Sequence, residues 1–232
     1  MKTVVMIPTY NEASNIKNVV SDVLNCGINT EVLIVDDMSP DGTYKIVENI
    51  SKQNNKVHLL LRKEKKGRGY AGKDGFIKAI DMNADFIVEM DGDGSHNPKC
   101  ISEFLKAIKN YDVVIGSRYI NGGKDEERTL LRKTISHFSR FYLAKVLGVN
   151  IKDPTSGYRM FKRDALKKFV YLLKANDPFI VTEVIYQIRN NNLKIKEVPI
   201  IFLKRFSGES KLRPTTLIKY LFKVLKLKIL GK

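Results

Sequence analysis

DFIVEMDGDGSHNP, residues 85–98, decides the fold class, because a short apolar run there ends directly in carboxylates. A run of this length is typical of a strand buried on both faces. The same arrangement occurs twice upstream, in KTVVMIP (2–8) before TYNE and in EVLIVDD (31–37) before MSPDG. Such runs alternating with helical windows predict an α/β fold, a Rossmann-like, mostly parallel sheet flanked by helices.

Strand and helix patterns alternate along most of the chain. Further strands are expected at 57–62 and 112–119, and helices at 15–25, 43–53, 70–82, 98–110 and 129–149. Pro8 is expected to end the first strand, and Asp41 to cap the second helix. Polar clusters follow four strands: PTYNE (8–12), DDMSPDG (36–42), DGDGSH (91–96) and GSRY (116–119). Because parallel sheets bind ligands beyond the carboxyl ends of their strands, these clusters predict one site at one sheet edge.

Charge divides the chain into two unequal halves. The 232 residues include 41 Lys and Arg and 25 Asp and Glu, a formal net charge of +16. Residues 1–100 carry 13 basic and 14 acidic side chains, whereas residues 101–232 carry 28 and 11. A basic half indicates an anionic partner, such as nucleic acid, an anionic lipid surface or a phosphorylated substrate. Lysines that are merely solvated are the alternative interpretation.

Several protein classes are disfavoured by composition. No stretch reaches the roughly 18 uninterrupted apolar residues of a membrane-spanning helix. The N-terminal residues enter a strand pattern at once, so no signal peptide is expected. Cys26 and Cys100 are the only cysteines, and neither a disulfide scaffold nor a structural zinc site is expected from them. A cytosolic location follows as the default.

The acidic residues after the fourth strand suggest a metal site. Asp91 and Asp93 are separated by one glycine at a tight turn, so they can hold one hard divalent cation and leave positions for phosphate oxygens. Ser95 and His96 are close enough to add a ligand or a supporting hydrogen bond. Taken alone, His96 is more typical of an ordinary surface histidine.

The first two strand ends carry residues suited to a nucleotide. Strand pleating turns Asp36 and Asp37 to opposite sides, so one is expected to support the structure and the other to meet a ligand. Glu12 can bond a ribose hydroxyl or favour the helix dipole. Tyr10 offers a flat face for a base.

These motifs together resemble the family-2 glycosyltransferases of GT-A fold, most closely the dolichyl-phosphate (polyprenyl-phosphate) mannose synthases. The resemblance extends from Val4 to about Lys211 and lies in six motifs in the right order. They are IPTYNE (7–12), VDDMSPDGT (35–43), MDGDGSHNP (90–98), GSRY (116–119), DPTSGYRMFKR (153–163) and RFSGESK (205–211).

The resemblance implies a role for each matching position. The implied nucleotide-sugar site comprises Pro8, Tyr10, Glu12, Val35, Asp37, Asp91, Gly92, Asp93, Arg205 and Lys211. The implied metal ligands are Asp91, Asp93 and Ser95, and the acceptor phosphate would meet Arg118, Arg132 and Ser136. Asp93, Arg118 and Arg205 are the implied catalytic residues.

Three positions depart from the family pattern. Arg68 stands between Gly67 and Gly69, where leucine is common, and the glycines would let backbone amides approach an anion. Gly92 replaces a usual alanine, and Ser95 stands where some members have glutamine. None of these changes removes a carboxylate or a basic contact, so they affect donor preference and metal choice more than the reaction.

The resemblance implies an inverting, metal-dependent transfer of a mannosyl unit from GDP-mannose to dolichyl or polyprenyl phosphate, with Mg²⁺ or Mn²⁺ as cofactor. A phosphate acceptor is mostly dianionic at pH 7, so no general base is expected. Another nucleotide sugar such as UDP-glucose, or a soluble acceptor, is the main alternative. A soluble nucleotidyltransferase and a nucleic-acid-binding module are less favoured. The aromatic side chains of the basic half do not interleave with basic ones, so no nucleic acid partner is expected.

The C-terminal segment is interpreted as a separate element. Residues 1–211 would form the catalytic domain and residues 212–232 a basic amphipathic helix. Lys219, Lys223 and Lys226 share one helical face, which is typical of a helix lying on an anionic membrane. A helix docked on the domain is nearly as well supported. Peripheral attachment to the cytoplasmic face is expected, through this helix or a membrane-anchoring subunit.

Overall fold

The computed structural model describes residues 1–64, 66–126, 130–203 and 214–231, with the side chains of 130–137 and 214–218 left out. The strands are β1 (Thr3–Thr9), β2 (Thr30–Asp36), β3 (Val57–Leu61), β4 (Phe86–Glu89), β5 (Val113–Ser117), β6 (Lys124–Asp125), β7 (Arg159–Lys162), β8 (Ile195–Pro199) and β9 (Ile201–Phe202). The α-helices are α1 (Ile16–Leu24), α2 (Thr43–Gln53), α3 (Arg68–Asp81), α4 (Ile101–Ile108), α5 (Leu130–Leu147), α6 (Arg163–Lys167), α7 (Ile180–Asn190) and α8 (Pro214–Leu230). Two short 3₁₀ helices are η1 (Pro98–Cys100) and η2 (Val170–Leu172).

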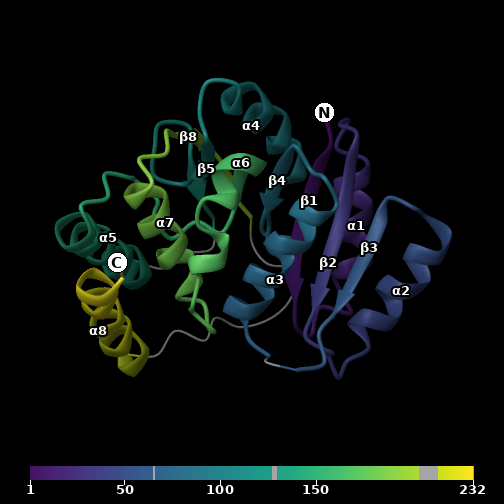
Figure 1. Cartoon of the computed structure of the whole chain (residues 1–232), viewed down its shortest axis with the longest axis horizontal. Helices are drawn as coiled ribbons and strands as arrows, with labels where there is room; N and C mark the ends of the chain where they lie inside the picture. Colours follow the sequence, from purple (N-terminus) through teal and green to yellow (C-terminus); the bar gives the residue numbers. More distant parts are fainter. Residues whose placement is uncertain (65, 127–129, 204–213, 232) are drawn as a thin grey trace.

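A mostly parallel sheet organises the molecule, as the sequence predicts. Its seven strands lie in the order β3-β2-β1-β4-β7-β5-β8, and β7 alone runs antiparallel to its neighbours. The carboxyl ends of β1, β2, β4 and β5 therefore meet at one edge (Figure 1). A small second sheet pairs β6 with β9 beside that edge. This topology gathers the predicted polar clusters.

The first strand continues past Pro8, whereas the sequence predicts that it stops there. β1 pairs with β4 only from Thr3 to Met6, but it pairs with β2 as far as Thr9. At Pro8 one side of the strand is therefore unpaired, and the missing N–H of proline costs no ladder bond there. The strand thus delivers Thr9 and the residues after it to the site edge.

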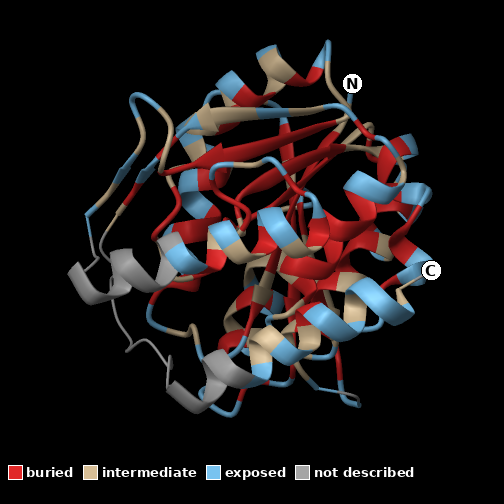
Figure 2. Ribbon diagram, turned by 90° about the vertical axis from the view of Figure 1, so that its left-hand side faces the viewer, coloured by how far each residue is buried: buried red, intermediate tan, exposed pale blue. Residues whose placement is uncertain are grey.

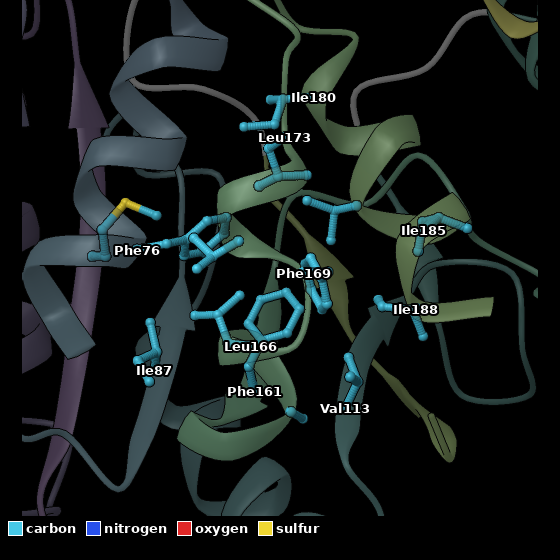
Figure 3. Packing of buried hydrophobic residues seen from close by; sticks show 14 of the residues in the cluster. Phe76, Ile87, Val113, Phe161, Leu166, Phe169, Leu173, Ile180, Ile185 and Ile188 are labelled. Carbon is cyan, nitrogen blue, oxygen red and sulfur yellow. The ribbon is translucent and has the colours of Figure 1, made fainter. Parts of the chain in front are cut away.

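Hydrophobic side chains pack on both faces of the sheet. Alternate residues of β1 serve the two cores: Val4 and Met6 face α3, whereas Val5 and Ile7 face α1. Figure 3 shows the first core, where α3, α6 and α7 close over the sheet, and Figure 2 shows the buried strands between exposed outer helix faces. Burial on both faces explains the continuous apolar runs.

The C-terminal helix α8 is docked on the domain. The side chain of Val224 is fully buried in the first core, and the hydroxyl of Tyr142 on α5 donates to the carbonyl of Leu221 at 3.1 Å. Lys223 pairs with Asp177, so this lysine faces the protein. The single lysine face expected from the spacing is therefore divided between the domain and solvent. Over the described part of the chain, the helices are too short or too polar to cross a membrane.

Candidate active site

A cavity of ≈ 370 Å³ opens at the carboxyl ends of β1 and β2. Its lining residues are Pro8, Thr9, Tyr10, Asp37, Lys66, Gly67, Arg68 and Ala71. Two cavities of similar volume lie elsewhere, one of them beside Asp85 and Asp112, which precede β4 and β5. Volume alone does not identify the site. Position identifies it: the cavity lies beyond the strand ends, where a sheet of this kind binds its ligands, and the acidic pair after β4 lies at the same sheet edge.

The two carboxylates after β2 have different surroundings. Asp36 is fully buried and accepts hydrogen bonds from the hydroxyls of Thr9 and Ser39, both at 2.7 Å. Asp37 lines the cavity, where it pairs with Arg62 and accepts a bond from the Gly67 N–H at 2.6 Å. Asp36 thus ties the first two strand ends together, whereas contact of Asp37 with a ligand stays a prediction.

Two more of the residues proposed for the nucleotide line the same cavity. Pro8 and Tyr10 line it, and the side chain of Tyr10 is 51% exposed, which leaves a ring face for a base. Glu12 accepts a bond from the Asn15 side-chain amide at 2.8 Å. Val35 is fully buried in the core under α3, and its contact with the nucleotide stays a prediction.

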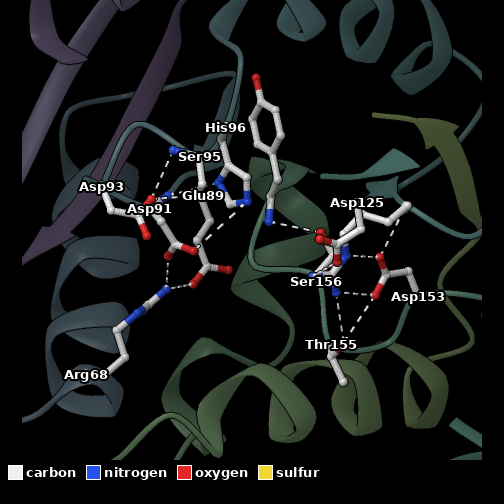
Figure 4. Close-up of polar contacts among 12 residues, drawn as sticks. Arg68, Glu89, Asp91, Asp93, Ser95, His96, Asp125, Asp153, Thr155 and Ser156 are labelled. Carbon is white, nitrogen blue, oxygen red and sulfur yellow. Dashed lines mark hydrogen bonds and ion pairs between the residues drawn. The ribbon is translucent and has the colours of Figure 1, made fainter. Parts of the chain in front are cut away.

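The acidic pair lies beyond the end of β4. The side chain of Asp91 is 39% exposed, and Asp93 accepts bonds from both the N–H and the hydroxyl of Ser95, at 3.0 and 2.5 Å. The Ser95 hydroxyl thus orients Asp93 (Figure 4). Carboxylate oxygens suit Mg²⁺ or Mn²⁺. Within the described residues no three His, Cys, Asp or Glu side chains gather to hold a metal, so two carboxylates would leave coordination positions to phosphate oxygens.

His96 is buried, although the sequence favours a surface position. Its ring stacks on Tyr158 at 4.8 Å between centroids and meets the edge of Phe202 at 5.4 Å. Nδ1 accepts the N–H of Asp91 at 3.1 Å, which places the proton of the neutral ring on Nε2. Burial lowers the pKa of His96, and the nearby Asp91 and Asp93 only partly oppose this. His96 therefore fixes the backbone from which Asp91 projects.

A partly buried ion pair adjoins the acidic pair. Nη2 of Arg68, at the start of α3, donates to Oε1 of Glu89 at 2.8 Å and lies 3.6 Å from Oδ1 of Asp91 (Figure 4). Burial lowers the pKa of Arg68, but Glu89 and Asp91 more than offset this, so the net shift is upward. The guanidinium stays charged between two carboxylates.

Arg118, proposed to meet the acceptor phosphate, is held by a buried partner. Nε and Nη2 of Arg118 donate to the two oxygens of Asp153 at 2.7 and 2.8 Å, and Nη2 also reaches Thr155. Its Nη1 lies 3.7 Å from Asp125. Burial opposes the charge on Arg118, but Asp153 more than offsets this and raises the pKa. Two of three guanidinium nitrogens are thus committed to the fold.

Four proposed site residues cannot be placed. Arg205 and Lys211 lie outside the described residues, and the side chains of Arg132 and Ser136 on α5 are also outside them. Their proposed roles stay predictions.

Sequence reasoning missed several residues that shape the site. Glu89 sits inside an apolar run, Arg62 directly follows β3, and Asp153 is quoted above only as part of a motif. Gly157 was missed as well: a Cβ there would lie 3.5 Å from both carboxylate oxygens of Asp91, an ordinary contact distance, so this segment lies directly beside that carboxylate. A charged residue within a buried strand is the one signal that points to Glu89, because such a charge needs a partner.

Gly67 and Gly69 serve chain packing and not only ligand approach. A Cβ on Gly69 would lie 2.1 Å from the carbonyl oxygen of Ala175, and one on Gly67 would lie 2.2 Å from that of Asn176. The N–H of Gly69 also donates to Asn176 at 3.2 Å. The start of α3 is therefore pressed against the backbone that precedes α7.

We expect Gly69→Ala to lower the free energy of unfolding by about 3 kcal/mol, because a backbone carbonyl cannot move aside as a side chain can. Gly72→Ala in the same helix is the control, since its Cβ would meet only the ends of Ile180 and Arg68 at 3.0 and 3.1 Å. Urea unfolding of both variants measures the difference. Equal stability of the two would contradict this explanation.

The comparisons with known proteins agree with this geometry. The model of glycosyl transferase family 2 matches residues 4–170. Polyprenol monophosphomannose synthase of Mycolicibacterium smegmatis is 35% identical, over 100% of this chain and 88% of that protein. Undecaprenyl-phosphate mannosyltransferase of Micrococcus luteus is 35% identical, over 91% of this chain and 88% of that protein. Dolichol-phosphate mannosyltransferase of Pyrococcus furiosus is 37% identical, over 95% of this chain and 62% of that protein.

Solved structures confirm the fold. Glucosyl-3-phosphoglycerate synthase from Mycobacterium tuberculosis, in complex with Mn²⁺, UDP and glucosyl-3-phosphoglycerate, superposes with a TM-score of 0.70 at 16% identity, covering 99% of this chain and 79% of that one. The same enzyme with Mn²⁺, UDP-glucose and phosphoglyceric acid gives 0.71 at 15% identity, covering 98% and 79%. The mostly parallel sheet is thus of the GT-A type, and this chain belongs to glycosyltransferase family 2.

Proposed function

We propose that this protein transfers a mannosyl unit from GDP-mannose to the phosphate of a polyprenyl phosphate, with inversion and with Mg²⁺ or Mn²⁺. The observation that carries the proposal is the relatedness over nearly the whole chain to three proteins named for mannose transfer to polyprenyl-type lipids. The cavity at β1 and β2, next to the acidic pair after β4, supports a nucleotide-sugar site.

The chain's own residues supply binding and orientation. Tyr10 and Asp37 would receive the nucleoside in the cavity. Asp91 and Asp93 would hold the metal, which when bound neutralises the charge that develops on the departing diphosphate. Ser95 orients Asp93, and His96 holds the backbone of Asp91 through the bond at 3.1 Å. These buried supports keep the carboxylates in place before the donor arrives.

The acceptor needs aiming more than activation. A phosphate monoester has a second pKa of about 6, so it attacks without losing a proton to the protein. Arg118 is the described basic residue proposed to aim it. With Nε and Nη2 on Asp153, Nη1 is the nitrogen that would turn toward a phosphate. The positions of Arg132, Ser136, Arg205 and Lys211 would add to this charge.

A transfer assay tests the proposal. Purified protein is incubated with labelled GDP-mannose, GDP-glucose, UDP-glucose or UDP-galactose, with polyprenyl phosphate or a soluble sugar phosphate as acceptor, and with Mn²⁺, Mg²⁺ or EDTA. We expect label in the lipid only with GDP-mannose and a divalent metal. Transfer from a UDP-sugar, or to the soluble acceptor in preference to the lipid, would instead support the alternative donor or acceptor.

The protein also presents an apolar and basic surface that suits a membrane. Phe138 and Phe141 on α5 are 50% and 61% exposed, and Phe222 and Ile229 on α8 are 68% and 71% exposed. The two helices lie side by side on the face shown in Figure 2. Exposed lysines accompany them on α8, among them Lys226. We propose that this α5–α8 surface attaches the protein to the cytoplasmic face of an anionic membrane, where the acceptor lipid resides, alone or with a membrane-anchoring subunit.

We expect the double variant Lys226→Glu/Lys228→Glu to bind vesicles containing anionic lipid at least roughly 30-fold more weakly, because each of the two lysines near such a surface contributes about 1 kcal/mol. Sedimentation with vesicles measures this. Lys17→Glu/Lys52→Glu is the matched control, since α1 and α2 lie on the other side of the molecule (Figure 1). Equal losses in both variants would show that net charge alone matters, and the proposed surface would be rejected.

A further inference from the structure

The pairing of Arg68 is incomplete in a specific way. Nη2 serves both Glu89 and Asp91, whereas Nη1 of Arg68 and Oε2 of Glu89 are buried without a hydrogen-bond partner. A fully formed arginine–carboxylate pair uses two parallel N–H bonds. Here the second bond is not made, and the same nitrogen is shared with the more exposed carboxylate.

Glu89 is the anchor of this arrangement. It ends β4, its side chain is 2% exposed, and Arg159 stands opposite it in the register with β7. The guanidinium of Arg159 donates to the main-chain carbonyls of Val181 and Pro154, at 3.0 and 3.2 Å. Among the described residues, Arg68 is thus the side chain that hydrogen-bonds to Glu89, whereas Arg159 acts on Glu89 through charge alone. Removing Arg68 leaves this buried carboxylate without a hydrogen-bonding side chain.

Asp91 is the variable partner. It lies two residues beyond Glu89, and its side chain is 39% exposed against 2% for Glu89. Its Oδ1 lies 3.6 Å from Nη2 of Arg68, whereas Oε1 of Glu89 lies 2.8 Å from the same nitrogen. It is the weaker of the two attachments of Arg68.

From this geometry we propose that Arg68 is a resident counter-cation that competes with the divalent metal for Asp91. When the metal takes Asp91, Arg68 turns fully to Glu89, where Nη1 and Oε2 complete a two-bond pair. Arg68 therefore lowers metal affinity in the free enzyme and keeps Asp91 positioned until the metal arrives. This inference rests on the proposed function, because it takes Asp91 and Asp93 as the metal ligands.

Direct metal titration tests the inference without any turnover. Mn²⁺ alone is titrated into the purified protein, and free Mn²⁺ is followed by its electron paramagnetic resonance signal. We expect Arg68→Met to bind Mn²⁺ roughly three- to tenfold more tightly, the scale for removing one unit charge at a partly exposed site. Lys63→Met, which removes an exposed charge from the segment between β3 and α3, is the control and should leave the affinity unchanged.

A second pair of variants covers the case in which Arg68→Met leaves Glu89 without its hydrogen-bond partner and unfolds the protein. Arg68→Met is then compared in the Glu89→Gln background, where no buried carboxylate loses its partner. Tighter Mn²⁺ binding in either folded background supports the inference, and unchanged or weaker binding overturns it. Asp93→Asn separates this failure from failure of the metal assignment: if the original protein and Asp93→Asn bind Mn²⁺ equally, the metal site itself is wrong and the inference falls with it.

Discussion

Asp93→Asn is expected to lower kcat/KM for mannosyl transfer at least roughly 100-fold while the protein stays folded. Asparagine keeps an oxygen that can accept both bonds from Ser95, at 3.0 and 2.5 Å, so the turn after β4 retains its support. Only the negative charge is lost. The departing diphosphate then lacks a firmly held counter-charge, because Asp91 alone would bind the metal.

The measurement is initial velocity with labelled GDP-mannose and polyprenyl phosphate over a range of Mn²⁺ concentrations. Partial rescue at high Mn²⁺ would locate the defect in metal binding. Asp22→Asn, an exposed carboxylate on α1, is the matched control and should leave the rate unchanged. An Asp93→Asn enzyme with full activity at low Mn²⁺ would rule out the metal role of this residue.

The strands that carry the site could be predicted because burial on both faces leaves a continuous apolar run. That is why the runs ending at Asp36 and Glu89 identify β2 and β4 without tertiary information. β7 is different: Arg159–Lys162 is four residues long and half basic. It is a strand only because β4 and β5 stand on either side of it, which no local pattern can reveal.

The site residues likewise include some that the sequence predicts and some that it does not. Polar clusters at strand ends predict that Asp37 and the acidic pair lie at one edge, since parallel strands share their direction. The partners of Arg68 and Arg118 could not be found from strand ends alone. Glu89 is 21 residues from Arg68 in the chain, and Asp153 is 35 residues from Arg118. The burial of His96 likewise depends on the ring of Tyr158, which arrives from a later segment.

The lysines of α8 show a limit of helical periodicity. Spacing places Lys219, Lys223 and Lys226 on one face, but it does not say which face the domain covers. Docking through Val224 turns Lys223 to Asp177 and leaves Phe222 and its apolar neighbours exposed. The exposed stripe is therefore more apolar than a simple amphipathic helix would present.

Asp153→Asn is expected to lower the free energy of unfolding by about 3–5 kcal/mol at pH 7, because it leaves the buried Arg118 charge without its counter-ion. Asp153 is fully buried and accepts bonds from the N–H, Nε and Nη2 of Arg118, at 3.0, 2.7 and 2.8 Å. An asparagine of the same shape can accept with only one oxygen. Asp81→Asn, an exposed carboxylate at the end of α3, is the control.

The acid dependence of stability gives the same pair a second readout. Burial raises the pKa of Asp153, but the hydrogen bonds and charge of Arg118 lower it by more than burial raises it. The folded pKa of Asp153 therefore lies below the ordinary value. A carboxylate with a depressed pKa stabilises the fold fully above its unfolded pKa of about 3.9 and loses that contribution as the pH falls through the folded value. Urea unfolding from pH 7 to pH 3 should therefore show a smaller stability loss for Asp153→Asn than for the original protein. If the two pH profiles ran parallel, Asp153 would not be the ionised partner of Arg118, and Arg118 would be available in full to a phosphate.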